Sequence, residues 1–256
     1  MSAANCPLKA KGIRMEQQLK PVPIGSQQNE WSQRPAGGAV ALDQSKVLRN
    51  TYWLLALSML PTIAGAYGGM AINFAAFYKT SPIMAPLLMF GAMIGSLFIV
   101  AALRNTAWGV VAVFGFTFIS GVMLAPMLQL AAGLKNGGQL VALAGGMTAA
   151  VFFVMATIAT VSKRDFSFLG KFLFVGLILL VIAMLANMFF QVPALAVALS
   201  AVAVLIFSLY LLYDVSDIVR GGETNYIMAT IRLFLDILNL FVNLLNLLMM
   251  LSGQRD

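Results

Sequence analysis

The sequence predicts an all-α, polytopic membrane protein with seven transmembrane helices behind a disordered N-terminal tail. Three observations predict it. The 256 residues are 61% hydrophobic and only 10% charged, with a mean hydropathy of +0.90, whereas roughly 25% of residues are charged in soluble domains. Seven apolar runs each reach the roughly 20 residues that a helix needs to cross a bilayer. The first fifty residues lack such a run.

The composition also excludes several kinds of site. The chain has no histidine and a single cysteine, Cys6. Metal centres and catalytic bases built on histidine are therefore excluded, as are an intrachain disulfide and a cysteine-based zinc site. The net charge of +7 lies mostly in the tail and the loops. We interpret it as a signal of membrane topology and expect no nucleic-acid partner.

Residues 1–50 are expected to form a flexible tail and residues 51–252 the membrane domain. The tail is rich in proline, glutamine, serine and lysine and has no sustained apolar period, which is typical of disorder. It also lacks the apolar core of a cleaved signal peptide. The run that starts near Thr51 would then act as an uncleaved start-transfer helix.

The seven expected spans are separated by polar and glycine-rich breaks. "NFAAFYKTSP", with Lys79 and Pro82, follows the first span and "RNTA" follows the second. "GLKNGG", "SKRDFS", "QVP" and "VRGGETN" follow the next four. The spans cover residues 51–72, 82–103, 108–132, 139–161, 168–189, 193–213 and 226–251.

The distribution of lysine and arginine predicts the orientation. Twelve of the sixteen lie on the side of the N-terminus, three lie on the other side, and Arg232 lies inside the seventh run. Because positive residues accumulate in the cytoplasm, the N-terminus is expected there and the C-terminus outside. The twelve are Lys9, Lys11, Arg14, Lys20, Arg34, Lys46, Arg49, Arg104, Lys163, Arg164, Lys171 and Arg220, and the three are Lys79, Lys135 and Arg255.

Small residues are frequent in the first four spans, for example in "AGAYGG" at 64–69 and at Gly91, Gly95, Gly121 and Gly145. Small side chains let membrane helices approach closely, so tight helix packing is the main expectation. A conduit lined by backbone is the alternative.

The seventh run carries a polar stripe. From Arg232 the polar positions continue at Asp236, Asn239, Asn243 and Asn246, with steps of four, three, four and three residues. These steps define one face of a helix, which cannot face lipid. Ionisable residues inside a membrane are costly and often functional.

Structural interpretations of the stripe compete with a functional one. The three asparagines could be hydrogen-bond links between helices. Arg232 and Asp236 have the spacing of an internal ion pair, which could be a structural lock. At the end of the sixth run, Asp217 is expected to be solvated. Asp214 follows an apolar stretch, and the hairpin at Gly221 and Gly222 would allow it to contact Asp236.

The chain resembles the Bax inhibitor family of membrane proteins (the TMBIM group), in particular its bacterial YccA-type branch. "YDVSDIVRGGETNYIMATIRLFLDILNLFVNLL" is similar to the C-terminal signature of the family. "RNTYWLLALSML", "FGFTFISGVMLAP" and "RDFSFLGKFLF" resemble its first span, its third span and the start of its fifth. The resemblance covers most of residues 48–251.

The resemblance implies a central seventh helix wrapped by the other six and an aspartate pair at Asp214 and Asp236. In some members this pair shares a proton and gates a pH-sensitive calcium leak, and an arginine contacts it in the closed form. Arg104 is the nearest candidate for that arginine. Arg232 stands where a small or hydroxyl residue is expected, and its charge would disfavour calcium nearby.

The resemblance also implies a non-enzymatic protein of the bacterial inner membrane. It would be a calcium or cation leak, a modulator of the membrane AAA protease FtsH that acts through the N-terminal tail, or both. No cofactor is expected, but a transported Ca²⁺ could be held by Asp214, Asp236 and the carbonyl of Asn239. The main alternative is an interaction regulator without ion conduction. A remote alternative, an intramembrane aspartyl protease, lacks its Gly-x-Gly-Asp motif. The oligomeric state stays open.

Overall fold

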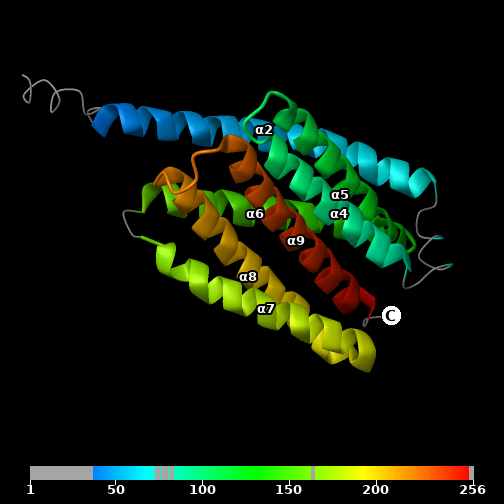
Figure 1. Cartoon of the computed structure of the whole chain (residues 1–256). Coiled ribbons are helices and arrows are strands. Elements are labelled where there is room, and N and C mark those ends of the chain that lie inside the picture. Colours follow the sequence, from blue (N-terminus) through cyan, green and yellow to red (C-terminus); the bar gives the residue numbers. More distant parts are fainter. Residues whose placement is uncertain (1–36, 73–75, 77–79, 81–83, 163–164, 254–256) are drawn as a thin grey trace, which may run out of the picture. The chain divides into compact units, whose positions relative to one another are not determined.

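The structure is a computed structural model that describes residues 37–72, 76, 80, 84–162 and 165–253. It contains seven long α-helices, and the described residues contain no β-strand (Figure 1). The prediction of an all-α membrane protein is therefore confirmed. In chain order the helices are α2 (Gly37–Ala71), α4 (Met84–Leu103), α5 (Trp108–Ala132), α6 (Gly137–Val161), α7 (Ser167–Phe190), α8 (Pro193–Val219) and α9 (Tyr226–Gly253).

Six of these helices are long and apolar enough to cross a membrane. The apolar part of α4, over 87–103, is shorter within the described residues. The turn expected around Lys79 and Pro82 lies outside them. The other breaks between spans fall where the sequence predicts them, because each contains glycine, proline or charged residues that end a helix.

The first helix begins earlier than its apolar run predicts. α2 starts at Gly37, and no proline interrupts it before Pro61. Its 35 residues extend over about 52 Å, compared with a hydrocarbon thickness of about 30 Å. Residues 1–36 of the expected tail lie outside the described residues. The tail boundary at residue 50 stays a prediction.

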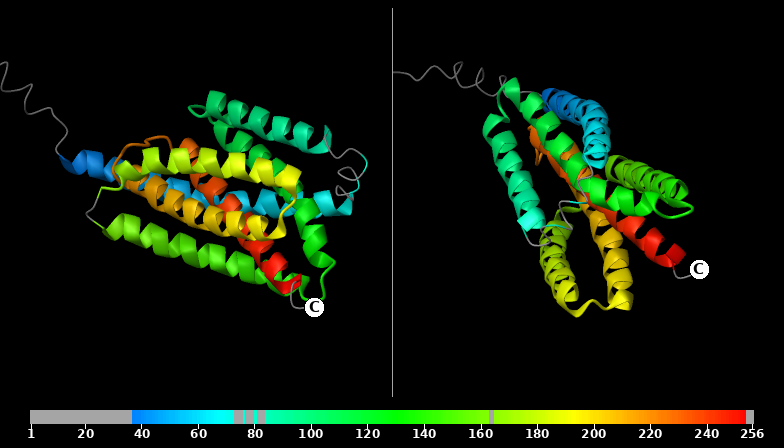
Figure 2. Two further views of the ribbon diagram at one scale, coloured as in Figure 1. Left: turned by 90° about the horizontal axis from the view of Figure 1, so that it is seen from below. Right: turned by 90° about the vertical axis from the view of Figure 1, so that its right-hand side faces the viewer.

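Helix α9 lies at the centre of the helices described here (Figures 1 and 2). It packs against α8, α6, α5 and α4. It also meets α2, where the hydroxyl of Thr230 donates to the carbonyl of Thr51 at 3.4 Å. Helix α7 packs against α8. The central place of the last helix explains why its face tolerates polar residues that lipid would not.

Helices α2 and α5 approach each other closely at two glycines. A Cβ atom added to Gly65 would overlap the carbonyl oxygen of Phe118, and one added to Gly121 would overlap that of Thr62. The backbones are therefore in direct contact, as the small residues predict. By contrast, Gly91, Gly95 and Gly145 have open space at the same position. Tight packing thus accounts for only some of the glycines.

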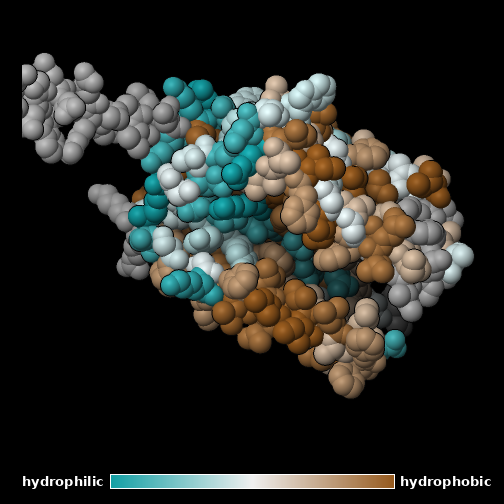
Figure 3. Space-filling view, viewed as in Figure 1, coloured by the Kyte–Doolittle hydropathy of each residue, from teal (hydrophilic) through white to brown (hydrophobic). Residues whose placement is uncertain are grey.

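The polar residues collect at one end of the helices, which we call the hairpin end because it carries the α8–α9 turn (Figure 3). A Cβ atom on Gly221 in this turn would meet the side chain of Gln44 on α2. Asn225 donates to the backbone carbonyl of Arg104 at 3.0 Å. Arg220 lies 3.9 Å from Asp165, between α6 and α7. Four chain segments therefore meet at this end, and the predicted positive residues Arg104 and Arg220 share it.

Large apolar side chains are exposed along the outer faces of the helices. In water such a surface would be an aggregation hazard, but in a bilayer it contacts lipid tails. Examples from five helices are Trp53, Leu60, Phe98, Phe153, Phe172, Phe189 and Leu205, each at least 65% exposed.

Candidate functional site

Two buried aspartates meet across the α8–α9 hairpin. Asp214, near the end of α8, is 7% exposed, and Asp236, in the first half of α9, is 6% exposed. The turn between the helices contains Gly221 at a φ of +79°. Glycine adopts this backbone conformation without steric cost, so the chain can reverse tightly here. The hairpin brings the two carboxyl groups together from opposite sides of the turn.

The side chains of Asp214 and Asp236 lie within electrostatic and hydrogen-bonding range of each other. Two ionised carboxylates only accept hydrogen bonds, so a bond between them requires a proton on one of them. Among the described residues, no protein group donates to the buried Oδ2 of Asp236. The pair can therefore exist with one shared proton, and the loss of this proton would leave two negative charges facing each other in an apolar surrounding.

Arg232 on α9 is paired with two other acids. Its Nη1 lies 3.0 Å from Oδ2 of Asp217, and its Nη2 lies 3.1 Å from Oε2 of Glu223. The side chains of the two acids are 25% and 15% exposed, and that of Arg232 is 42% exposed. We call these three residues the charge triad. It lies at the hairpin end, closer to the turn than the aspartate pair.

The charge triad corrects two expectations from the sequence. Arg232 and Asp236 do not form the internal ion pair that their spacing allows, because side chains on a helix lean towards its N-terminus and Arg232 reaches back to the hairpin end. Asp217 is not a solvated surface residue, since Arg232 donates to its carboxylate. Glu223 was not predicted as a partner, although it is the only acid in the turn sequence "GGETN".

Arg104 does not reach the aspartates. It is exposed at the end of α4, and within the described residues it forms no ion pair with Asp214 or Asp236. It lines a small polar pocket of about 340 Å³ at the hairpin end, together with Asn105, Glu223, Thr224 and Asn225. Its predicted role as the charge partner of the pair thus has no contact to support it here.

The asparagines of the stripe differ in their contacts. Asn239 and Asn243 each donate to the backbone carbonyl four residues earlier in α9, at 2.8 Å. Only Asn246 links two helices, since its amide donates to the hydroxyl of Ser200 on α8 at 3.1 Å. Hydrogen bonding between helices therefore accounts for one of the three. In Figure 3 hydrophilic surface is visible deep in a hollow between two apolar areas.

Asn225 organises the start of α9 and was not predicted as a site residue. Its Oδ1 accepts from the backbone N–H groups of Ile227 and Met228, at 3.0 and 3.2 Å. This is the hydrogen-bonding pattern of a helix N-cap. Its Nδ2 donates to Asn105 and Arg104 in the α4–α5 turn. The signal was available in the sequence, because an asparagine directly precedes the helical run.

A second, exposed charge pair connects the α6–α7 turn with α8. The Nε atom of Arg220 lies 3.9 Å from Oδ1 of Asp165. Hydrogen bonds from the hydroxyl and the N–H of Ser167 hold the pKa of Asp165 below its usual value. Asp165 therefore stays ionised throughout the physiological pH range, so it does not act as a pH sensor.

The fold and the site together define a polytopic, all-α membrane protein whose central last helix carries one half of a buried aspartate pair. Residues 44–253 match the family described as inhibitor of apoptosis-promoting Bax1. The chain belongs to the Bax inhibitor family, and the resemblance noted in the sequence is confirmed.

Relatives of high similarity occur in several bacteria. A membrane protein of Vibrio cholerae is 43% identical over 214 residues, which cover 83% of this chain and 93% of the relative. A protein of Pseudomonas aeruginosa is 39% identical, with 82% and 91% covered. YccA of Escherichia coli K12, named a modulator of FtsH protease, is 38% identical, with 81% and 91% covered. YccA of another E. coli strain is named an inner membrane protein.

Proposed function

We propose that the chain is a non-enzymatic membrane protein in which Asp214 and Asp236 form a proton-controlled gate for a calcium or cation leak. The observation that supports this best is the proximity of two buried carboxyl groups on different helices. With one shared proton, a hydrogen bond between them would hold α8 against α9. Without the proton the two charges repel, and the contact between the helices is weakened.

The deprotonated pair is chemically suited to a hard cation. Ca²⁺ prefers oxygen ligands, and two carboxylates supply both oxygen atoms and charge. Asn239 could add its side-chain oxygen, because its amide nitrogen is already bonded to the carbonyl of Leu235. Among the described residues no group of three or more histidines, cysteines and acids could hold a metal ion. Two acids and an amide suit a transported cation better than a permanently bound one.

Arg232 does not prevent this function. A guanidinium one turn from Asp236 would compete with a cation if it turned towards the pair. Its two terminal nitrogens are instead bonded to Asp217 and Glu223. In this arrangement the charge of Arg232 is balanced within the charge triad.

Protons and cations would compete for the same carboxylates, so the leak should decrease as the pH falls. The experiment is calcium flux into proteoliposomes that contain the purified chain, with protein-free liposomes as the reference. Flux above the reference that responds to pH supports the gate. Flux equal to the reference at every pH would contradict the gate. The chain would then be an interaction regulator that conducts no ions.

Regulation of a membrane protease is the second candidate, because YccA is named a modulator of FtsH protease. In this role the N-terminal tail would be the segment that meets the protease. Deletion of residues 1–36 leaves all of α2 in place, so the membrane domain should fold. Longer lifetime of the shortened chain in cells that contain FtsH, but not in cells without it, would support the role. Equal lifetimes in both would contradict it.

The positive residues support a cytoplasmic N-terminus and an external C-terminus in the bacterial inner membrane. At least two of the predicted cytoplasmic residues, Arg104 and Arg220, lie at the hairpin end with Gln44 of α2. The aspartate pair would then be reached from the cytoplasm past the charge triad.

A further inference from the structure

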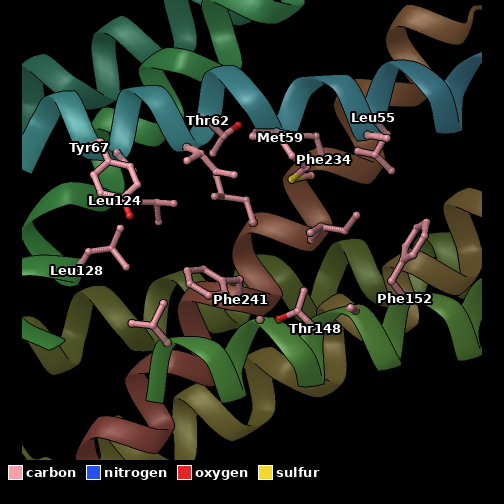
Figure 4. Close-up of a pocket in the computed structure, with 18 of the residues that line it drawn as sticks. Leu55, Met59, Thr62, Tyr67, Leu124, Leu128, Thr148, Phe152, Phe234 and Phe241 are labelled. Carbon is pink, nitrogen blue, oxygen red and sulfur yellow. The ribbon is translucent and has the colours of Figure 1, made fainter. Parts of the chain in front are cut away.

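A large apolar pocket lies between α2 and α6, and neither the aspartate pair nor the charge triad lines it. Its volume is about 1020 Å³, and residues of α5 and α9 also contribute to its walls. In Figure 4 the side chains of Met59, Leu124 and Phe241 lie in the space between α2, α6 and α9. Its volume and apolar lining are those of a ligand-binding pocket.

The pocket has the length and the opening that suit a lipid tail. Its α2 wall runs from Tyr52 to Met70, a distance of about 27 Å along a helix, which approaches the hydrocarbon thickness of about 30 Å. Tyr67 and Phe153 line it and are 69% and 67% exposed. The pocket therefore opens sideways, towards the lipid.

One end of the pocket offers polar groups. The residues of α2 that line it follow a helical period of three and four residues, and the same period continues back from Tyr52 to Arg49. Arg49 is exposed. The hydroxyl of Tyr52 is buried, and no described residue bonds to it. The ring of Tyr52 packs edge-on against Phe152 of α6, with 5.9 Å between the centroids, and marks this end of the pocket.

We propose that this pocket binds a phospholipid of the bilayer with an anionic headgroup. An acyl chain lies along α2 between α6 and α9, and the phosphate lies beside Arg49 at the hairpin end. Charge complementarity selects the headgroup, because a guanidinium matches a phosphate. Tyr52 lines the pocket, and its hydroxyl, to which no described residue bonds, supplies a donor for a lipid oxygen. The proposal does not depend on ion conduction.

The walls favour an acyl chain over a transmembrane helix of a partner. Interfaces between helices in membranes are enriched in small residues that let the backbones approach closely. The α6 wall carries the small residues Gly138, Gly145 and Ala149, whereas on the α2 wall small residues such as Ala56 and Ala66 alternate with Met59 and Met70. Flexible methionine side chains adapt to a mobile chain better than to a rigid helix surface.

Two neighbouring glycines of α6 provide a matched test. A Cβ atom on Gly145 or on Gly146 meets no atom within 4 Å, so both positions accept a side chain. Only Gly145 lines the pocket. Native mass spectrometry of the detergent-purified chain with added phosphatidylglycerol should detect bound lipid. G145F should lower its affinity by about tenfold, and G146F should leave it unchanged. Equal affinities for both variants would overturn the proposal.

The preference for an anionic headgroup is tested with a variant of Arg49 and a control variant on another helix. The wild-type chain should bind phosphatidylglycerol more tightly than phosphatidylcholine with the same acyl chains. R49Q should remove this preference but retain the binding of the acyl chain, while K171Q on α7, which does not line the pocket, should preserve the preference. If R49Q keeps the preference, the assignment of the headgroup to this end is wrong.

The same spectra identify the alternative occupant. A wild-type chain that binds no lipid but forms a dimer, which G145F abolishes and G146F does not, would assign the pocket to a second copy of the chain. That result would also overturn the proposal.

Discussion

Arg232 on α9 donates to Asp217 on α8, with 3.0 Å between Nη1 and Oδ2. Asp236 lies one turn further along the same helix as Arg232, yet this arginine is paired away from it. The α8–α9 hairpin therefore separates its charges into an ion-paired triad near the turn and a pair of buried aspartates further along the two helices. Each can be tested alone.

The charge triad should contribute to stability. R232Q leaves Asp217 and Glu223 close together without a cation. We expect a loss of about 1–2 kcal/mol in the free energy of unfolding, between the values for exposed and buried pairs. Thermal unfolding in detergent measures it. R104Q is the control, because Arg104 makes no ion pair with the described acids. Equal melting temperatures for both variants would contradict this role of the triad.

The contact between α2 and α5 should not tolerate even a methyl group. G65A places a Cβ atom on the carbonyl oxygen of Phe118 and should destabilise the protein by about 1–3 kcal/mol. G68A is the control, because its Cβ atom would meet no atom within 4 Å. G68A should be neutral or slightly stabilising, since alanine is a better helix former than glycine. A stable G65A variant would show that the two helices separate easily.

The start of α9 should depend on Asn225. N225A removes the acceptor of two helix N–H groups and the link to the α4–α5 turn. A cost of about 1 kcal/mol is expected for the lost cap, with faster amide hydrogen exchange at 226–230. T224A, an exposed neighbour, should leave the exchange unchanged. If both variants exchange at the wild-type rate, Asn225 does not hold this end of the helix.

The predicted orientation in the membrane follows from the positive residues. The activity of fused reporter proteins measures it. A reporter that works only in the cytoplasm should be active when fused after Arg164 and inactive when fused after Arg255. Activity at both positions would place the C-terminus in the cytoplasm and mean that the last helix does not cross fully.

The class of fold was predictable from the sequence, because apolar runs are local patterns. The polar stripe likewise marked the face of α9 that carries the buried Asp236. The partners of Arg232 were not predictable in the same way. Spacing along one helix favoured Asp236, whereas the observed partners come from α8 and the turn. The early start of α2 was missed because it extends beyond the apolar run. The pocket between α2 and α6 is lined by segments about 85 positions apart in the sequence, so no local pattern predicts it.

The shared proton is the central claim, and calcium flux across a pH series tests it most directly. Proteoliposomes with the wild-type chain should lose flux as the pH falls, because protons compete with the cation for Asp214 and Asp236. D236N keeps the shape and a hydrogen-bonding group but removes the second acid, so its flux should no longer depend on pH. D165N is the control, since Asp165 is exposed and paired with Arg220, and it should keep the wild-type profile. A D236N profile that follows the wild type at every pH would contradict the gate.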